Sequence, residues 1–112
     1  MPKKVEMEKV RLTFNVKLDF NLDSEFSSVF LVGNTKELGL WNPEKALELK
    51  RKGDIFTKMK TFEKNQVLEY KILLQKTYDK VELDENFAEL ENRTEVCDKA
   101  KTINLIVKNF KI

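Results

Sequence analysis

Few side chains in this sequence are equipped for catalytic chemistry. The 112 residues include no histidine, which removes the commonest general base and the commonest transition-metal ligand. Cys97 is the single cysteine, so neither an internal disulfide nor a multi-thiolate metal site can form. No serine lies in a Gly-x-Ser-x-Gly turn. We therefore expect a protein that is not an enzyme and that needs no cofactor and no metal ion.

Carboxylates are concentrated late in the chain. Residues 78–98 hold eight acidic and two basic side chains. Carboxylate oxygens are Ca²⁺ ligands, but residues 79–91 lack the D-x-D-x-D-G pattern of a calcium-binding loop. No spacing singles out two carboxylates for glycoside hydrolysis. A solvated loop is the simpler interpretation of this segment.

Trp41 is the residue whose type and position best indicate a binding function. It is the only tryptophan, and it lies in a segment interrupted by Gly39 and Pro43. Two interpretations stay open from the residues alone. The ring either plugs one end of the fold, or it is an exposed platform that stacks on a ligand with an apolar face.

Charge does not favour nucleic acid or membrane as a partner. The formal net charge is only +2, although residues 45–64 hold seven basic and three acidic side chains. Phe56 and Phe62 are interleaved with the lysines of this segment, and one face of an alternating strand must be core. We expect both rings to be buried rather than available to stack on bases.

The elements that must position these residues are strands. Apolar residues alternate with polar ones over residues 12–20, and Val29–Val32 is a continuous apolar run that indicates a strand buried on both faces. The spacing of Phe87, Leu90 and Glu91 leaves a short helix over residues 86–93 as an alternative to a polar loop. The pattern predicts an all-β fold, an antiparallel β-sandwich of immunoglobulin-like type with seven to eight strands. Predicted strands cover 12–20, 29–32, 47–49, 55–62, 67–74, 81–83 and 102–107.

The segment around Trp41 resembles a known family. Residues 32–46 read VGNTKELGLWNPEKA, which is similar to the signature V-G-x-x-x-E-L-G-x-W-x-P-x-K-A of the family 20 carbohydrate-binding modules, the starch-binding domains. Glu69-Tyr70-Lys71 resembles the E-Y-K strand of that family. Phe87 stands five residues before Asn92-Arg93, where the family has a tryptophan before an Asn-Arg pair. The resemblance extends from about residue 11 to residue 108.

This resemblance implies non-catalytic binding of α-glucan, such as starch, glycogen or a maltooligosaccharide. Trp41 is then the first aromatic platform, Lys71 its polar partner, Phe87 a second and smaller ring, and Asn92 a hydrogen-bonding group. The alternatives are a surface lysine for Lys71, a loop anchor for Phe87 and a turn cap for Asn92. We interpret Tyr70 and Tyr78 as packing residues.

The resemblance also frames the wider organisation of the chain. A second family site uses tyrosines, and its nearest equivalents here, Phe26 and the turn at residues 52–54, contain none, so we expect one working site. Residues 1–10 read as an N-terminal extension and 11–112 as the glucan-binding domain, with a fused or associated catalytic domain as a further partner. Because residues 1–11 lack an apolar signal-like stretch, a cytoplasmic setting is expected. The alternative function is a protein-interaction β-sandwich that has lost glucan binding.

Overall fold

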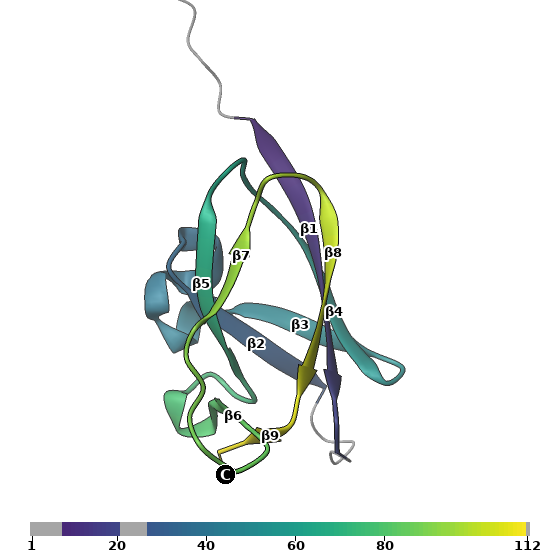
Figure 1. The fold of residues 1–112 in the computed structure, drawn as a ribbon, viewed down its shortest axis with the longest axis vertical. Helices are drawn as coiled ribbons and strands as arrows, with labels where there is room; N and C mark the ends of the chain where they lie inside the picture. Colours follow the sequence, from purple (N-terminus) through teal and green to yellow (C-terminus); the bar gives the residue numbers. More distant parts are fainter. Residues whose placement is uncertain (1–7, 21–26, 112) are drawn as a thin grey trace, which may run out of the picture.

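The computed structural model describes residues 8–20 and 27–111, and strands dominate this part of the chain (Figure 1). Three short 3₁₀ helices lie in the connections: η1 (Lys36–Trp41), η2 (Pro43–Lys45) and η3 (Tyr78–Lys80). The strands are β1 (Lys9–Leu18), β2 (Ser28–Gly33), β3 (Leu47–Lys52), β4 (Ile55–Glu63), β5 (Val67–Leu73), β6 (Glu82–Leu83), β7 (Arg93–Val96), β8 (Lys101–Val107) and β9 (Asn109–Phe110).

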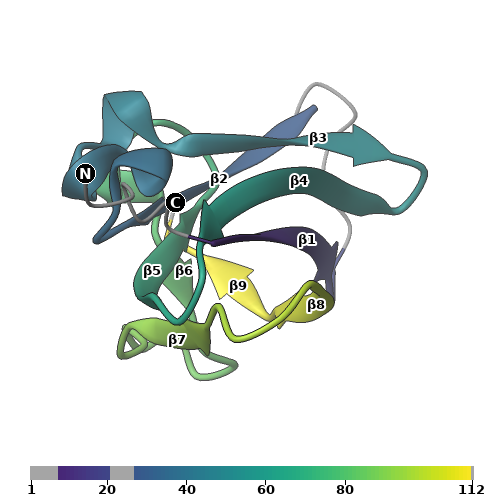
Figure 2. The same ribbon diagram turned by 90° about the horizontal axis from the view of Figure 1, so that it is seen from above.

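Seven of these strands form one curled sheet in the order β7-β5-β2-β3-β4-β1-β8, and β6 pairs with β9 in a small second sheet. Every pair of the large sheet is antiparallel except β1 with β8, which run parallel. The sheet folds over on itself, so that β7 and β8 become its two edges (Figures 1 and 2). The expected all-β, sandwich-like fold is confirmed.

The core lies inside the curl and follows from the alternation seen in the sequence. Leu12, Phe14 and Val16 of β1 are fully buried, while the residues between them are partly exposed. Phe14 makes edge-on ring contacts with Phe62 and Tyr70, with ring centroids 6.1 Å and 5.9 Å apart. Phe56 and Phe62 are each 1% exposed, so the prediction that both rings are core residues is confirmed.

Strand β2 is buried on both of its faces, as its continuous apolar run predicted. Leu31 belongs to the core inside the curl. Val32 belongs to a second apolar cluster on the outer face of the sheet, together with Leu73, Val81 and Leu83. This outer cluster is covered by residues of the connections, and it is the surface on which the candidate site is built.

The structure differs from the sequence prediction in three connections. Residues 35–44, interpreted from the sequence as irregular because of Gly39 and Pro43, contain η1 and most of η2. Residues 93–96 form strand β7 with half-buried Arg93 and Glu95, a polar pattern that carries no apolar alternation. The alternative helix over 86–93 does not form, and this stretch contains a turn followed by the start of β7. Residues 21–27 read NLDSEFS, which predicts a turn after the first strand, and all of them except Ser27 lie outside the described residues.

Candidate functional site

The loop that carries Trp41 is fixed to the sheet at its first residues. Gly33 ends β2 opposite Tyr70, and a Cβ atom there would lie 2.3 Å from the Glu69 carbonyl oxygen. The Asn34 side chain then continues the ladder, donating to the Val67 carbonyl at 3.0 Å and accepting from the Glu69 N–H at 3.0 Å. The Gly-Asn pair therefore lets the chain leave the sheet without leaving backbone groups unpaired.

The next turn places three consecutive residues in the left-handed region. Thr35 caps η1, its hydroxyl accepting from the Leu38 N–H at 3.3 Å. Gly39, Leu40 and Trp41 then have φ values of 81°, 50° and 62°. Gly39 is required there twice over, because a Cβ would also lie 2.5 Å from the Lys45 carbonyl oxygen. Leucine and tryptophan rarely adopt this conformation, and each is strained by it.

The Trp41 side chain packs on the outer apolar cluster and stays half-buried. Its neighbours in that cluster are the buried side chains of Val32, Leu73, Val81 and Leu83, with Phe30 and Ala46 also packed there. Leu40, the preceding residue, is 65% exposed. The indole is thus supported by the sheet and partly open to solvent.

Tyr78 of η3 holds the Trp41 segment from outside the sheet. Its hydroxyl donates a hydrogen bond of 2.6 Å to the Trp41 carbonyl oxygen, and the residue is 40% exposed. Partial burial raises the pKa of this phenol above its ordinary value. Tyr70, by contrast, is 1% exposed and is a packing residue, as expected.

Lys71 shares the outer face of the sheet with Trp41. It lies opposite Val32 in the β2–β5 register, so the two side chains project from the same face. Lys71 is half-buried, and its ammonium donates to the Leu90 carbonyl oxygen at 2.6 Å. This bond links β5, the strand that carries Lys71, to the loop between Phe87 and Asn92.

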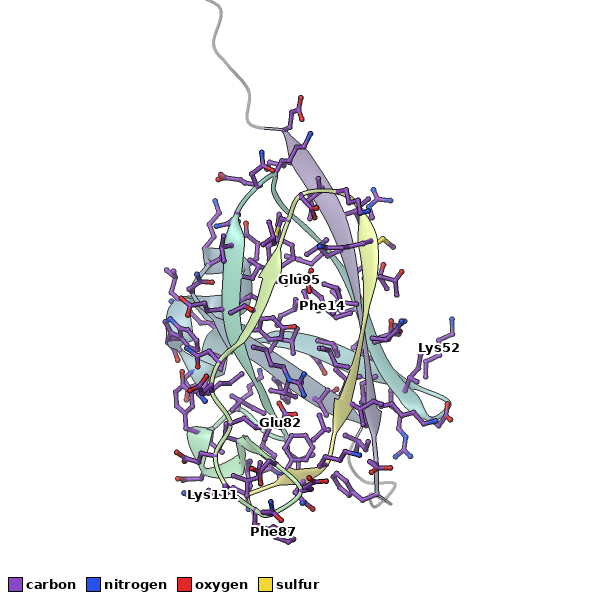
Figure 3. The ribbon with its side chains drawn as sticks, in the orientation of Figure 1. Phe14, Lys52, Glu82, Phe87, Glu95 and Lys111 are labelled. Carbon is purple, nitrogen blue, oxygen red and sulfur yellow. The ribbon has the colours of Figure 1, made fainter. Side chains whose placement is uncertain are left out.

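Phe87 is presented at the tip of a tight turn at one end of the molecule (Figure 3). The Asp84 carboxylate accepts from the Asn86 and Ala88 N–H groups at 2.8 Å and 2.9 Å, and the Phe87 N–H donates to the Asp84 carbonyl oxygen. Phe87 has a φ of 62° and is 69% exposed. A ring so exposed does not anchor its loop by burial.

Backbone strain coincides with the sequence-predicted site. Positive φ occurs at four non-glycine residues of the described chain, and Trp41 and Phe87 are two of them, with Leu40 and Asn65. Strain of this kind persists only where the surroundings enforce it, and it gathers at functional positions. Two aromatic residues predicted to bind ligand are therefore both held in costly conformations.

Asn92 is exposed and its side chain forms no hydrogen bond within the described residues, so it does not cap a turn there. The next residue is firmly fixed. Arg93 donates to both carboxylate oxygens of Glu82, at 2.9 Å and 2.5 Å, and Glu82 is 4% exposed. These bonds raise the pKa of the Arg93 guanidinium despite its partial burial.

The structure places some of the four predicted residues closer together than others. Trp41 and Lys71 share one face of the sheet, and the Lys71–Leu90 bond brings the loop of Phe87 and Asn92 into the same region. Phe87 makes no ring contact with another aromatic side chain of the described residues. Tyr78 hydrogen-bonds to the backbone carbonyl of Trp41, and sequence reasoning missed this link because no spacing connects residues 41 and 78.

The described residues offer little for other chemistry. Within 8–20 and 27–111, no group of three or more His, Cys, Asp or Glu side chains is placed to hold a metal ion. In the same ranges, no helix has the length and apolar character needed to cross a membrane.

Comparison with known proteins identifies the family. The model of the CBM_20 family, described as "Starch binding domain", matches residues 9–103. The chain therefore belongs to the starch binding domain family. No curated protein shows a significant match to the sequence.

Solved structures share the fold at low sequence identity. The family 20 carbohydrate-binding module of a maltotetraose-forming amylase from Pseudomonas saccharophila STB07 aligns with a TM-score of 0.61 and 16% identity, covering 87% of this chain and 99% of the other. A glucoamylase from Hormoconis resinae aligns at 0.67 and 19%, over 96% of this chain and 19% of the enzyme. A family 15 glucoamylase from Hypocrea jecorina aligns at 0.62 and 16%, over 97% and 19%. The chain thus spans about a fifth of these two glucoamylases.

Proposed function

We propose that this protein binds α-glucan, such as starch, glycogen or a maltooligosaccharide, by stacking the sugar on Trp41. Membership of the starch binding domain family supports this function. The observation that carries the site is the half-buried indole, supported by the outer apolar cluster and fixed through its carbonyl oxygen by Tyr78. The C–H groups of a glucose ring pack on such an aromatic face.

The polar groups around the ring fit a sugar with many hydroxyls. The Lys71 ammonium has three protons and uses one of them on the Leu90 carbonyl, which leaves donors for hydroxyl oxygens. The exposed Asn92 amide can both donate and accept. Phe87 supplies a second ring of smaller area, presented by a rigid turn. No bond is made or broken, and the module acts by holding its ligand.

The biological role that follows is tethering. Similar folds form about a fifth of two glucoamylases, and a module of this kind would hold an attached or associated catalytic domain on its polysaccharide. The affinity of one site should be modest, because the footprint is small and the ordering of ligand and side chains offsets much of the contact energy.

Isothermal titration with maltoheptaose, together with retention on amylose resin, tests the proposal. Trp41→Ala should weaken binding by about thirtyfold or more, the usual loss when a central aromatic anchor is removed. Leu40→Ala is the matched control, since this 65%-exposed neighbour lies in the same strained segment but has no ring. Equal binding by the wild type and Trp41→Ala would refute the proposed site. A folded wild type that binds no glucan would instead favour a protein-interaction sandwich.

A further inference from the structure

The inner face of β4 breaks the pattern of a core strand. Phe56 and Phe62 are buried, yet Lys58 and Lys60 occupy the two inward positions between them. In the ladder with β1 these lysines lie opposite Phe14 and Leu12, which are core residues. A lysine at a core position is rarely tolerated, so the exposure of this part of β4 needs a structural reason.

The reason is that β3 and β4 separate soon after their shared turn. Their pairing covers only residues 50–52 with 55–57, and Figure 2 shows the two strands diverging beyond it. The opened face forms a groove of about 790 Å³ whose walls include β3, β4 and the segment of η1 and η2. An adjoining hollow shares Lys36 and Lys60 with it. The sequence-predicted basic segment therefore lines a concave surface.

Positive charge converges on this groove. The groove and the adjoining hollow are together lined by the six cations Arg11, Lys36, Lys45, Lys50, Lys58 and Lys60, against the two carboxylates Glu37 and Glu48. None of the six takes part in an ion pair within the described residues. A concave surface of one charge sign concentrates its field and attracts ligands of the opposite sign. A neutral glucan has no use for this charge, so the groove calls for a different ligand.

The backbone of β4 indicates what kind of anion would fit. Beyond Thr57, β4 pairs with β1 on one side only, and residues 58–62 form no other backbone hydrogen bond in the described part of the chain. Alternate N–H and C=O groups of that edge therefore point into the groove unpaired. An extended peptide can complete such an edge by adding a strand.

We propose that this groove binds an extended acidic segment of a partner protein, which pairs with the open edge of β4. Residues two apart on an added strand are separated by about 7 Å, the repeat that also separates Lys58 from Lys60, so a Glu-x-Glu pattern places carboxylates beside both lysines. The intervening side chains face outward with Met59, which is 51% exposed and favours apolar partners. Trp41 does not line the groove, and peptide binding there does not depend on glucan binding.

The test measures binding of a fluorescein-labelled peptide of alternating glutamate and valine by fluorescence anisotropy. The wild-type protein should bind it, and Lys58→Glu with Lys60→Glu should weaken binding at least about tenfold, since both facing ion pairs become repulsive. The control variant combines Lys17→Glu with Lys99→Glu, which changes the net charge equally outside the groove. Its affinity for the peptide should stay within about twofold of the wild type.

Two further ligands separate strand addition from simple charge attraction. A peptide with N-methyl groups at alternate backbone positions should bind at least about tenfold more weakly, because it cannot pair with the edge. Amides within residues 58–62 should become protected from hydrogen exchange only with the unmethylated peptide. Equal binding of the methylated peptide, or tighter binding of a single-stranded thymidine oligonucleotide, would overturn the proposal. So would a wild type that binds no peptide at low salt.

Discussion

The hydroxyl of Tyr78 should control how well Trp41 is presented to a ligand. Leu40 and Trp41 are both left-handed, and each costs about 1–2 kcal/mol relative to ordinary backbone. Packing on the outer cluster and the 2.6 Å bond from Tyr78 to the Trp41 carbonyl oppose this strain. Tyr78→Phe keeps the ring and removes only the donor. The change therefore tests the bond and leaves the packing in place.

The expected size of the effect follows from the bond that is lost. A partly exposed hydrogen bond contributes a net 0.5–1.5 kcal/mol, to order of magnitude. If that amount is released when the loop relaxes, the binding-competent conformation becomes less populated, and apparent affinity falls by about two- to tenfold. The free energy of unfolding should fall by no more than about 1.5 kcal/mol, because the core is untouched.

Titration of tryptophan emission with maltoheptaose measures this loss of affinity, and acrylamide quenching reports the accessibility of the indole. Tyr78→Phe should bind more weakly and should also be quenched more readily in the absence of ligand. Asp79→Asn is the control, since this exposed neighbour lies in the same 3₁₀ turn. Unchanged affinity together with unchanged quenching would refute the reasoning, since the bond would then not be what positions Trp41.

Three other perturbations have defined outcomes. Phe87→Ala should weaken maltoheptaose binding by about two- to tenfold in calorimetry. The urea midpoint should not change, because the ring is 69% exposed. A shifted midpoint with unchanged affinity would show that Phe87 stabilises the fold and does not bind the ligand. Glu82→Gln should lower the free energy of unfolding by about 2–3 kcal/mol in urea melts, because Arg93 loses its buried counter-charge; a loss under about 0.5 kcal/mol would contradict this. Burial raises the pKa of Tyr70 to about 12 from 10.0, so the unfolded chain loses this proton first and stability should fall by up to about 3 kcal/mol between pH 10 and 12. Tyr70→Phe should lack that component in urea melts across the same pH range, and an identical pH profile for both proteins would refute it.

Apolar alternation was sufficient to predict the strands that build the core. Strand β1 and the doubly buried β2 follow directly from which positions carry leucine, valine and phenylalanine. Strand β7 could not be predicted in this way, because its inward residues are Arg93 and Glu95. They are tolerated there because Glu82 and Lys101 neutralise them at the edge of the sheet.

The candidate site was predictable in its residue types and less so in its geometry. The loop signature and the Glu-Tyr-Lys strand pointed to Trp41 and Lys71. They share a face because Lys71 lies opposite Val32, and Trp41 packs on the cluster that contains Val32. The contact of Tyr78 with Trp41 depends on how two connections meet outside the sheet, which local patterns do not encode. The groove around Lys58 could not be predicted from the sequence for a related reason. Alternation places Lys58 on the inward face of β4, and only the divergence of β3 from β4 exposes it.

The central claim is that Trp41 is the surface on which an α-glucan binds. Because it is the only tryptophan, the emission of the wild-type protein reports on this one ring. Titration with maltoheptaose should produce a saturable change in the intensity or wavelength of that emission, with half-saturation at millimolar concentration or below, in order of magnitude. A folded protein whose emission does not change up to about ten times that concentration would contradict the account.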